Sequence, residues 1–193
     1  MPPSVSLDLA MKRHKPLYEE GNIAVGNNQR SQITMTDEEI ATFVVQSRIA
    51  TMGTIGPDGR PHLIAMWYGV LDGVIWFETK GRAQKVKNLL RDDRITCMIE
   101  DGHTYDSLRG VSIEGRGVVI DDPEVLWKVG VSVWERYNGP YTNEVKPFVE
   151  MMLAKRVAVR VDVERMRSWD HKKLGMPSSE VTGSTAQFLG QKR

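Results

Sequence analysis

Five cations and no acid lie between positions 80 and 91 of the 193-residue chain: Lys80, Arg82, Lys85, Lys87 and Arg91. The segment follows a strand-like run that ends at Thr79, and its apolar spacing predicts a helix. Free backbone N–H groups and the helix dipole favour an anion at the start of a helix. Arg82 and Lys85 are three residues apart, so they share one face of this helix. The corner therefore suits a phosphate or a string of carboxylates.

A cationic helix can also be no more than a solvated face. On a typical exposed helix, acids placed four residues from the bases neutralise them. The helix predicted in GRAQKVKNLLRDD offers no Asp or Glu for such pairs within itself. We therefore expect its partner to be an external anion.

Three bulky residues, Met66, Trp67 and Tyr68, lie late in the strand-like run PHLIAMWYGV. Their side chains can simply belong to the core. A strand edge of this composition can also flank a flat ring system, and its backbone amides can hydrogen-bond the polar edge of that ring. We expect these residues to lie near the same corner as Thr79.

No motif for hydrolysis or metal binding accompanies the corner. The four histidines are scattered without metal-ligand spacing, and the chain has no CxxC, HExxH, GxSxG or P-loop pattern. The single cysteine, Cys97, lies in the alternating run RITCMIE and is expected to be a buried, inert thiol. The chemistry that remains is chemistry carried by a cofactor.

Short antiparallel strands dominate the predicted elements. Six runs read as strands: RIATMGTI, PHLIAMWYGV, VIWFET, RITCMIE, LRGVSIEGRGVVI and RVAVRVDV. The glycines of the fifth run predict a bent, bulged strand. Helices are expected over about 37–47, within GRAQKVKNLLRDD ending at 92–93, and over about 122–137 and 147–154, and the second docks through Val86, Leu89 and Leu90. This order favours a mainly β fold with helices, closed or nearly closed into a barrel, over a doubly wound parallel sheet.

Length and charge bound the organisation of the chain. We expect an extended arm over 1–33, one cofactor-binding domain over 34–170 and a tail over 171–193. No apolar run approaches the ~20 residues that span a bilayer, and the N-terminus lacks a secretory apolar stretch, so a cytoplasmic protein is expected. A formal net charge of +1 disfavours a nucleic-acid-binding protein.

The residues from Ser47 to Ile99 carry a family likeness. The DGRP turn, the strand ending in Thr79 and the Lys-x-x-Asn-Leu helix together resemble the pyridoxamine 5′-phosphate oxidase-like proteins, particularly the actinobacterial flavin/deazaflavin-dependent oxidoreductases of the B group. The likeness covers about 36–167. It implies a split β-barrel of about six antiparallel strands, of the FMN-binding type, in an obligate homodimer with cofactor sites at the interface.

The resemblance also implies the roles of the site residues. The cofactor ring would lie along Met66, Trp67 and Tyr68, and its phosphate or polyglutamyl tail on Thr79, Lys80, Arg82, Lys85 and Asn88. Hydride transfer between the cofactor ring and a small organic acceptor is then the expected reaction. The protein would supply orientation and a desolvated slot, so no catalytic side chain is assigned.

Departures from the family pattern bear on which cofactor binds. FMN-dependent members resemble one another in an Arg and a Lys on the second strand, near the places where this chain has Ile64 and Gly69. The PHxxxMWY pattern and the cationic helix look more like members that bind the deazaflavin coenzyme F420. F420 is therefore the expected cofactor. An FMN-dependent pyridoxamine 5′-phosphate oxidase-like protein and a non-enzymatic binder of flavin, F420 or haem are the alternatives.

Overall fold

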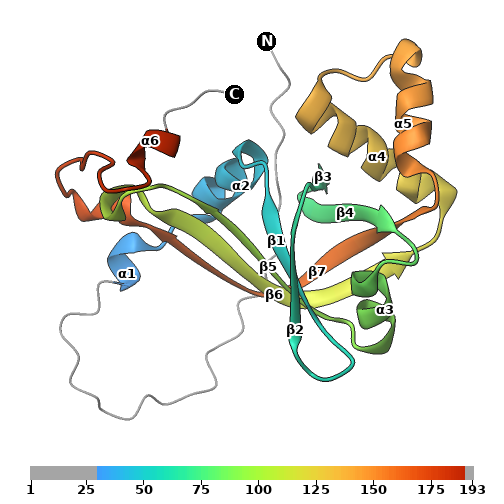
Figure 1. Ribbon diagram of the computed structural model, residues 1–193, viewed down its shortest axis with the longest axis horizontal. Coiled ribbons are helices and arrows are strands. Elements are labelled where there is room, and N and C mark those ends of the chain that lie inside the picture. Colours follow the sequence, from blue (N-terminus) through green and yellow to red (C-terminus); the bar gives the residue numbers. More distant parts are fainter. Residues whose placement is uncertain (1–29, 190–193) are drawn as a thin grey trace.

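The computed structural model describes residues 30–189, whose elements are drawn in Figure 1. In chain order these are α1 (Arg30–Ile33), α2 (Asp37–Gln46), β1 (Ala50–Ile55), β2 (Pro61–Met66), β3 (Gly69–Leu71), β4 (Val74–Lys80), α3 (Gln84–Arg91), β5 (Arg94–Asp101), β6 (Arg109–Ile120), α4 (Pro123–Asn138), α5 (Lys146–Leu153), β7 (Arg156–Asp170) and α6 (Ala186–Leu189). Short 3-10 turns occupy Tyr105–Ser107, Asn143–Val145 and His171–Leu174.

The strands form one curled antiparallel sheet in the order β2-β1-β5-β6-β7-β4-β3. β2 and β3 are its two edges, yet only Trp67 and Tyr68 separate them in the chain. Three Cα–Cα steps span at most about 11 Å, so the two edges must lie close together. The sheet is thus a split barrel with helices, which confirms the predicted fold class.

The described sheet has seven strands, one more than the predicted number, because the run PHLIAMWYGV is not one strand. β2 pairs with β1, whereas β3 pairs with β4. At the junction the Tyr68 N–H donates to the Tyr137 hydroxyl at 3.1 Å. The Val70 N–H donates to the Ser132 hydroxyl at 3.1 Å. Two side chains of α4 thus accept hydrogen bonds from backbone N–H groups at the junction, where the chain leaves its pairing with β1 and begins its pairing with β4.

Two long strands run the length of the barrel and pair with each other. The register of β6 and β7 shifts between Glu114 and Gly115, where Glu164 of β7 is the extra residue, so the bulge predicted on the glycine-rich strand lies on its partner. A Cβ on Gly115 would lie 2.1 Å from the Asp162 carbonyl oxygen, so only glycine fits there. β7 continues to Asp170, well beyond the predicted run RVAVRVDV, because its second half pairs with the first half of β6.

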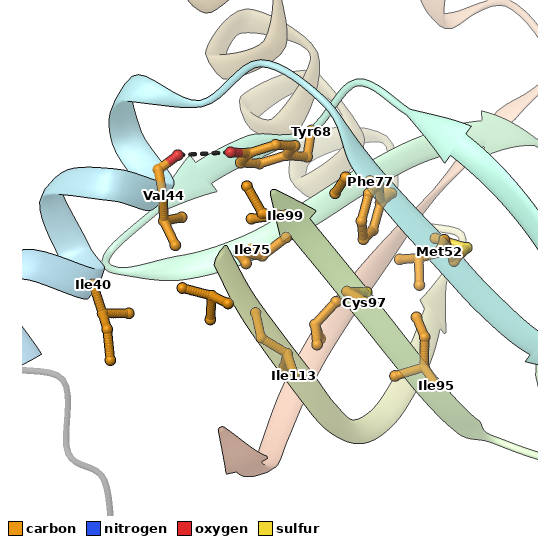
Figure 2. Close-up of a cluster of buried hydrophobic side chains, with 14 of the residues drawn as sticks. Ile40, Val44, Met52, Tyr68, Ile75, Phe77, Ile95, Cys97, Ile99 and Ile113 are labelled. Carbon is orange, nitrogen blue, oxygen red and sulfur yellow. Dashed lines mark hydrogen bonds between the residues drawn. The ribbon is translucent and has the colours of Figure 1, made fainter. Parts of the chain in front are cut away.

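The barrel interior is filled by the alternate residues of its strands, as Figure 2 shows. Met52, Phe77, Ile99 and Ile113 are fully buried there. Cys97 lies among them, and burial raises the pKa of its thiol to about 12. The prediction of a buried, unreactive thiol is therefore confirmed.

Helix α2 closes one end of the barrel. Its start is the predicted capping box, in which the Glu39 N–H donates to Thr36 Oγ1 at 3.2 Å and the Thr36 N–H donates to the Glu39 carboxylate at 2.6 Å. Ile40, Phe43 and Val44 are buried in the core. The reciprocal cap fixes where the helix begins, and its apolar stripe fixes how it docks.

Helix α3 docks by a narrower face than the sequence predicts. Val86 and Leu89 are buried, but Leu90 is 71% exposed. Leu89 packs against Gly117 of β6, where a Cβ would come within 2.8 Å of its side chain. Asn88, a polar residue, occupies the remaining buried position. The prediction for Leu90 is therefore wrong.

The predicted arm and tail lie at the edges of the described residues. Residues 1–29 and 190–193 fall outside them, so the predicted extended arm can be followed only over Arg30–Ile33, which forms one helical turn. In the predicted tail, the Lys173 ammonium donates to the Thr34 carbonyl at 2.9 Å and to the Glu39 carboxylate at 2.5 Å. The domain boundaries stay a prediction.

Candidate functional site

Four of the five cations predicted to bind an anion, Lys80, Arg82, Lys85 and Lys87, lie on the turn from β4 into α3 and the first half of that helix, and Arg91 lies at its far end; we call this region the cationic corner. The Gly81 N–H donates to the Lys155 carbonyl at 3.0 Å, which ties the turn to the start of β7. Ala83, at the N-cap of α3, provides no side-chain cap, and the first helical turn contains no acid. The helix start therefore carries uncapped N–H groups and surplus positive charge.

Lys85 is the cation most closely built into the corner. Its ammonium donates to Thr79 Oγ1 at 3.1 Å, and the Thr79 side chain is buried. Burial, followed by the nearby Arg156 guanidinium, lowers the pKa of Lys85, while Glu78 acts in the opposite direction. An anion beside this ammonium would favour its charged form.

The other cations differ in what they contact. The Lys80 ammonium donates to a backbone carbonyl in the turn between α5 and β7 at 2.9 Å. The Arg91 guanidinium donates to the last carbonyl of β1. The side chains of Arg82 and Lys87 are exposed and make no hydrogen bond or ion pair within residues 30–189. Arg82 lies just before the N-cap of α3 and Lys85 lies on its first turn, and neither forms an ion pair with an acid among these residues.

Asn88 is fully buried rather than open to solvent. Its Nδ2 donates to Thr54 Oγ1 at 3.0 Å, and its Oδ1 accepts a hydrogen bond from Gln84 Nε2 at 2.8 Å. The side chain therefore holds α3 against β1. Within the described residues, Asn88 therefore positions the helix that carries the cations.

Sequence reasoning missed two charged residues at the corner, Glu78 and Arg156. The register of β4 and β7 pairs Lys80 with Arg156, and the Arg156 guanidinium forms an ion pair with the Glu78 carboxylate. Burial raises the pKa of Glu78, against the effects of Arg156, Lys80 and Lys85. Glu78 could have been found from the sequence, because it is next to Thr79. Arg156 could not, because the strand pairing that places it at the corner joins distant parts of the chain.

The residues predicted to flank a ring do not join the cationic corner directly. Tyr68 adjoins Gly69, which pairs with Trp76 on β4, and Thr79 lies three residues further along that strand. The separation is about 10 Å at ~3.3 Å per strand residue. A long ligand can span this distance, and the expectation that these residues lie near the corner stays a prediction.

Met66, Trp67 and Tyr68 also point in different directions. Met66 is half-buried against the core, and Tyr68 is fully buried in it. Trp67 is 51% exposed and stacks on Tyr137, with ring centroids 4.2 Å apart and planes within 3°. Of the three, only Trp67 presents an open aromatic face.

Tyr68 is held by the end of α2, as Figure 2 shows. Its hydroxyl donates to the Val44 carbonyl at 2.7 Å and lies 3.1 Å from the Ser47 carbonyl. Burial raises the pKa of this hydroxyl to about 12. The Arg136 guanidinium lies 4.5 Å from the ring centre. Tyr68 therefore fixes the β2–β3 junction from inside the barrel.

We expect Tyr68→Phe to lower the free energy of unfolding at pH 7 by only about 1 kcal/mol, because Arg136 still donates to the same carbonyls. The pH profile is more specific. The Tyr68 phenol has a pKa of 10 in the unfolded chain and about 12 in the folded protein. The contribution of this hydroxyl to the free energy of unfolding is therefore complete below pH 10 and is lost as the pH rises towards 12. Denaturant titrations at pH 9–12 should show a shallower alkaline decline for Tyr68→Phe. Parallel profiles would contradict the assignment.

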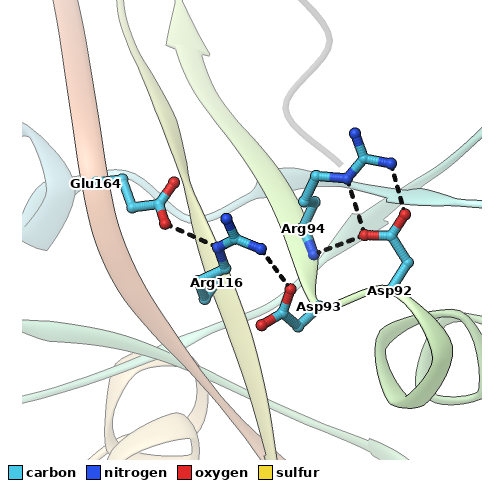
Figure 3. A network of polar contacts seen from close by, with 5 residues as sticks. All are labelled: Asp92, Asp93, Arg94, Arg116 and Glu164. Carbon is cyan, nitrogen blue, oxygen red and sulfur yellow. Dashed lines mark hydrogen bonds and ion pairs between the residues drawn. The ribbon is translucent and has the colours of Figure 1, made fainter.

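A network of exposed ion pairs lies at the far end of α3 (Figure 3). Arg94 holds the Asp92 carboxylate at 2.6 Å, and its hydrogen bonds lower the pKa of Asp92 to about 2. Arg116 of β6 bridges Asp93 and Glu164, each at 2.7 Å. These exposed pairs connect the α3–β5 turn with β6 and β7.

Two surface hollows lie between the start of β1 and the end of β5, and at the end of α3. Neither is lined by the residues predicted to bind the cofactor. Among residues 30–189 no group of three or more His, Cys, Asp or Glu side chains is placed to hold a metal ion. Over the same residues, no helix is both long and apolar enough to cross a membrane.

The fold and the match to a family model define the class of protein. The model of the pyridoxamine 5′-phosphate oxidase family matches residues 36–170, more than half of the chain. The chain therefore belongs to the pyridoxamine 5′-phosphate oxidase family, as the sequence resemblance predicted. No curated protein matches the sequence.

Solved structures give a similar result. The chain is 59% identical to the conserved hypothetical protein Rv2991 from Mycobacterium tuberculosis, with a TM-score of 0.80 over 83% of this chain and 100% of that one. An F420 reductase is 21% identical, with a TM-score of 0.53 over 68% and 98% of the two chains. A heme binding protein from Mycobacterium smegmatis is 17% identical, with a TM-score of 0.52 over 70% and 58%. The last two likenesses show the fold alone.

Proposed function

We propose that the protein binds coenzyme F420 at the cationic corner and transfers hydride from its reduced form to a small organic acceptor. The observation that carries this proposal is the uncapped start of α3, with Arg82 and Lys85 unpaired by acids and Lys85 bonded to Thr79. A helix start of this kind attracts anions, and several cations match a tail with several acidic groups.

The residues of the corner fit the acidic tail of F420. Lys85, Arg82 and the first N–H groups of α3 would bind its acidic oxygens, and Lys80 would add charge from the end of β4. Asn88 would act through its bonds to Thr54 and Gln84, which keep α3 in place. When bound, the reduced deazaflavin ring supplies the hydride.

The exposed face of Trp67 is our candidate surface for the ring. It lies on the β2–β3 junction, and Tyr137 fixes the indole from the other side. Stacking on an indole already held in place loses little side-chain entropy. In this proposal Trp67 orients the ring and excludes water from one face, while Met66 and Tyr68 support the junction from the interior.

The alternative ligand is FMN, because the uncapped helix start suits a single phosphate as well. Haem is a third possibility within the same fold, represented by the heme binding protein among the similar structures. Ile64 and Gly69, which stand near the Arg and Lys places of FMN-dependent members, favour F420. The occurrence of an F420 reductase with the same fold agrees with this choice.

Ligand titrations test the proposal. The chain has five tryptophans, so we expect F420 to quench their fluorescence in a saturable way. FMN should bind at least tenfold more weakly. A deazaflavin riboside without the phosphate and glutamates should lose most of the affinity, because the corner then has nothing to bind. Tighter binding of FMN, or no saturable binding of F420, would refute the proposed cofactor.

We also expect a homodimer, formed through the outer face of β2, β1 and β5. On this face Leu63 is 65% exposed and lies across Gly53, and Met98 is also exposed. Light scattering at micromolar concentration should give twice the chain mass of 21.8 kDa. Leu63→Glu should shift this mass towards the monomer, whereas Leu90→Glu, on the exposed face of α3, should not. A monodisperse 21.8 kDa species in the unmodified protein would contradict the dimer.

A further inference from the structure

Arg156 reaches the cationic corner from a distant part of the chain. It is the first residue of β7, and the β4–β7 register places it opposite Lys80. Its side chain is 27% exposed. Because β7 begins beside the turn into α3, the positive charge of Arg156 lies next to the residues proposed to bind the cofactor tail.

The guanidinium of Arg156 is only partly satisfied by its neighbours. Nη1 donates to the Glu78 carboxylate and lies 3.5 Å from the Glu78 carbonyl. Nε is buried and has no hydrogen-bond partner within residues 30–189, and Nη2 has none there either. Nε and Nη2 form one edge of the planar group, and this edge matches two oxygens of a carboxylate or a phosphate.

The charge balance around Glu78 also calls for an anion. This single buried carboxylate faces Arg156, Lys80 and Lys85, which come from β7, β4 and α3. One acid cannot neutralise three cations. Arg156 is also near enough to Lys85 to lower the pKa of its ammonium, so the surplus positive charge includes both groups.

We propose that Arg156 is an anion-binding residue of the cationic corner, which holds a carboxylate or phosphate group of the ligand through its Nε–Nη2 edge, and that Glu78 is the positioning residue that fixes the guanidinium. This inference rests on the proposed function, because it assigns a further contact to the same ligand tail. The site then draws on three elements: β4, α3 and β7.

Arg156→Lys is the decisive variant. It retains a positive charge beside the buried Glu78, so the protein should fold, but it removes the two-donor edge. We expect the affinity for F420 to fall about tenfold. The matched control is Arg160→Lys, on the same strand, where the guanidinium pairs with Asp162 at 2.6 Å. Its affinity should stay within twofold of the unmodified protein. Equal affinities for the Arg156→Lys and Arg160→Lys proteins would overturn the proposal.

Glu78→Gln separates the positioning role from a purely structural one. The amide oxygen can still accept from Nη1, while the corner gains one positive charge. We therefore expect F420 to bind as tightly as before or more tightly. A loss of affinity equal to that of Arg156→Lys would contradict the role given to Glu78.

Direct anion titrations keep the inference separate from the choice of cofactor. Inorganic pyrophosphate and γ-linked triglutamate, added separately, should shift the Arg156 Nε–H signal in nuclear magnetic resonance spectra, and the probe that shifts it at lower concentration identifies the preferred acidic group. If F420 fails to bind but either anion shifts this signal, the cofactor proposal fails and the Arg156 assignment stands. If F420 binds while neither anion nor F420 moves the signal, the Arg156 assignment fails.

Discussion

Replacement of Lys85 by alanine should weaken F420 binding roughly ten- to a hundredfold. Charge-assisted hydrogen bonds contribute about 1.5–3 kcal/mol, and each 1.4 kcal/mol corresponds to about tenfold in affinity. Lys85 combines a position on the first turn of α3 with a hydrogen bond to Thr79 that fixes its ammonium. Fluorescence titration of the purified variants measures the change. The free energy of unfolding should fall by less than about 1 kcal/mol, since a single part-buried bond is lost.

Lys87→Ala is the matched control for this prediction. Lys87 carries the same charge on the same helix, but it is exposed and has no partner within the described residues. Side chains two positions apart do not share a helix face, so its loss should change affinity by no more than about twofold. If Lys87→Ala were as damaging as Lys85→Ala, binding would depend on a diffuse cationic patch, and the preference for an anionic-tailed cofactor would lose its main support.

The second large effect concerns stability. We expect Arg136→Met to lower the free energy of unfolding by about 3 kcal/mol, because hydrogen bonds to a charged group contribute about 1.5–3 kcal/mol each and do not add fully. The Arg136 guanidinium donates to the Val45 carbonyl at 2.9 Å and the Ser47 carbonyl at 2.6 Å. It thereby caps the end of α2, where helix carbonyls lack partners, and lies over the Tyr68 ring.

Thermal unfolding measures this effect. For a chain of this size, 3 kcal/mol corresponds to a fall in Tm of about 6–12 °C. Arg48→Met serves as the control, since the exposed Arg48 side chain makes one long hydrogen bond, 3.4 Å, to the Arg136 carbonyl and one cation–π contact, 4.9 Å, with the Tyr137 ring. It should cost less than about 1 kcal/mol. If the two variants lost the same free energy of unfolding, the hydrogen bonds from Arg136 to the end of α2 would not be an important source of stability.

The parts of the fold that could be predicted are those whose signals are local. Thr36 and Glu39 fix the start of α2 through side-chain bonds three residues apart, and the sequence shows both. Gly115 lies opposite a bulge on β7, and a side chain there would collide with that strand. The cationic corner was equally visible, since its charges lie within one turn and one helix.

What could not be predicted depends on contacts between distant parts of the chain. Arg156 meets Glu78 across 78 residues, through strand pairing that the sequence does not specify. The strand expected over PHLIAMWYGV breaks because Tyr137, on a helix formed much later in the chain, bonds to the backbone of Tyr68. Leu90 fits the predicted stripe by spacing, but the short helix docks through Asn88 instead.

The two-residue link between β2 and β3 has a consequence for local opening. Edge strands of an open sheet usually fray separately, because nothing connects them. Here β2 cannot move far from β1 without pulling on Tyr68, whose ring is buried and whose hydroxyl is bonded to α2. The backbone amides of β2 and β3 should therefore exchange with deuterated solvent as one cooperative unit, although they lie at opposite ends of the strand order.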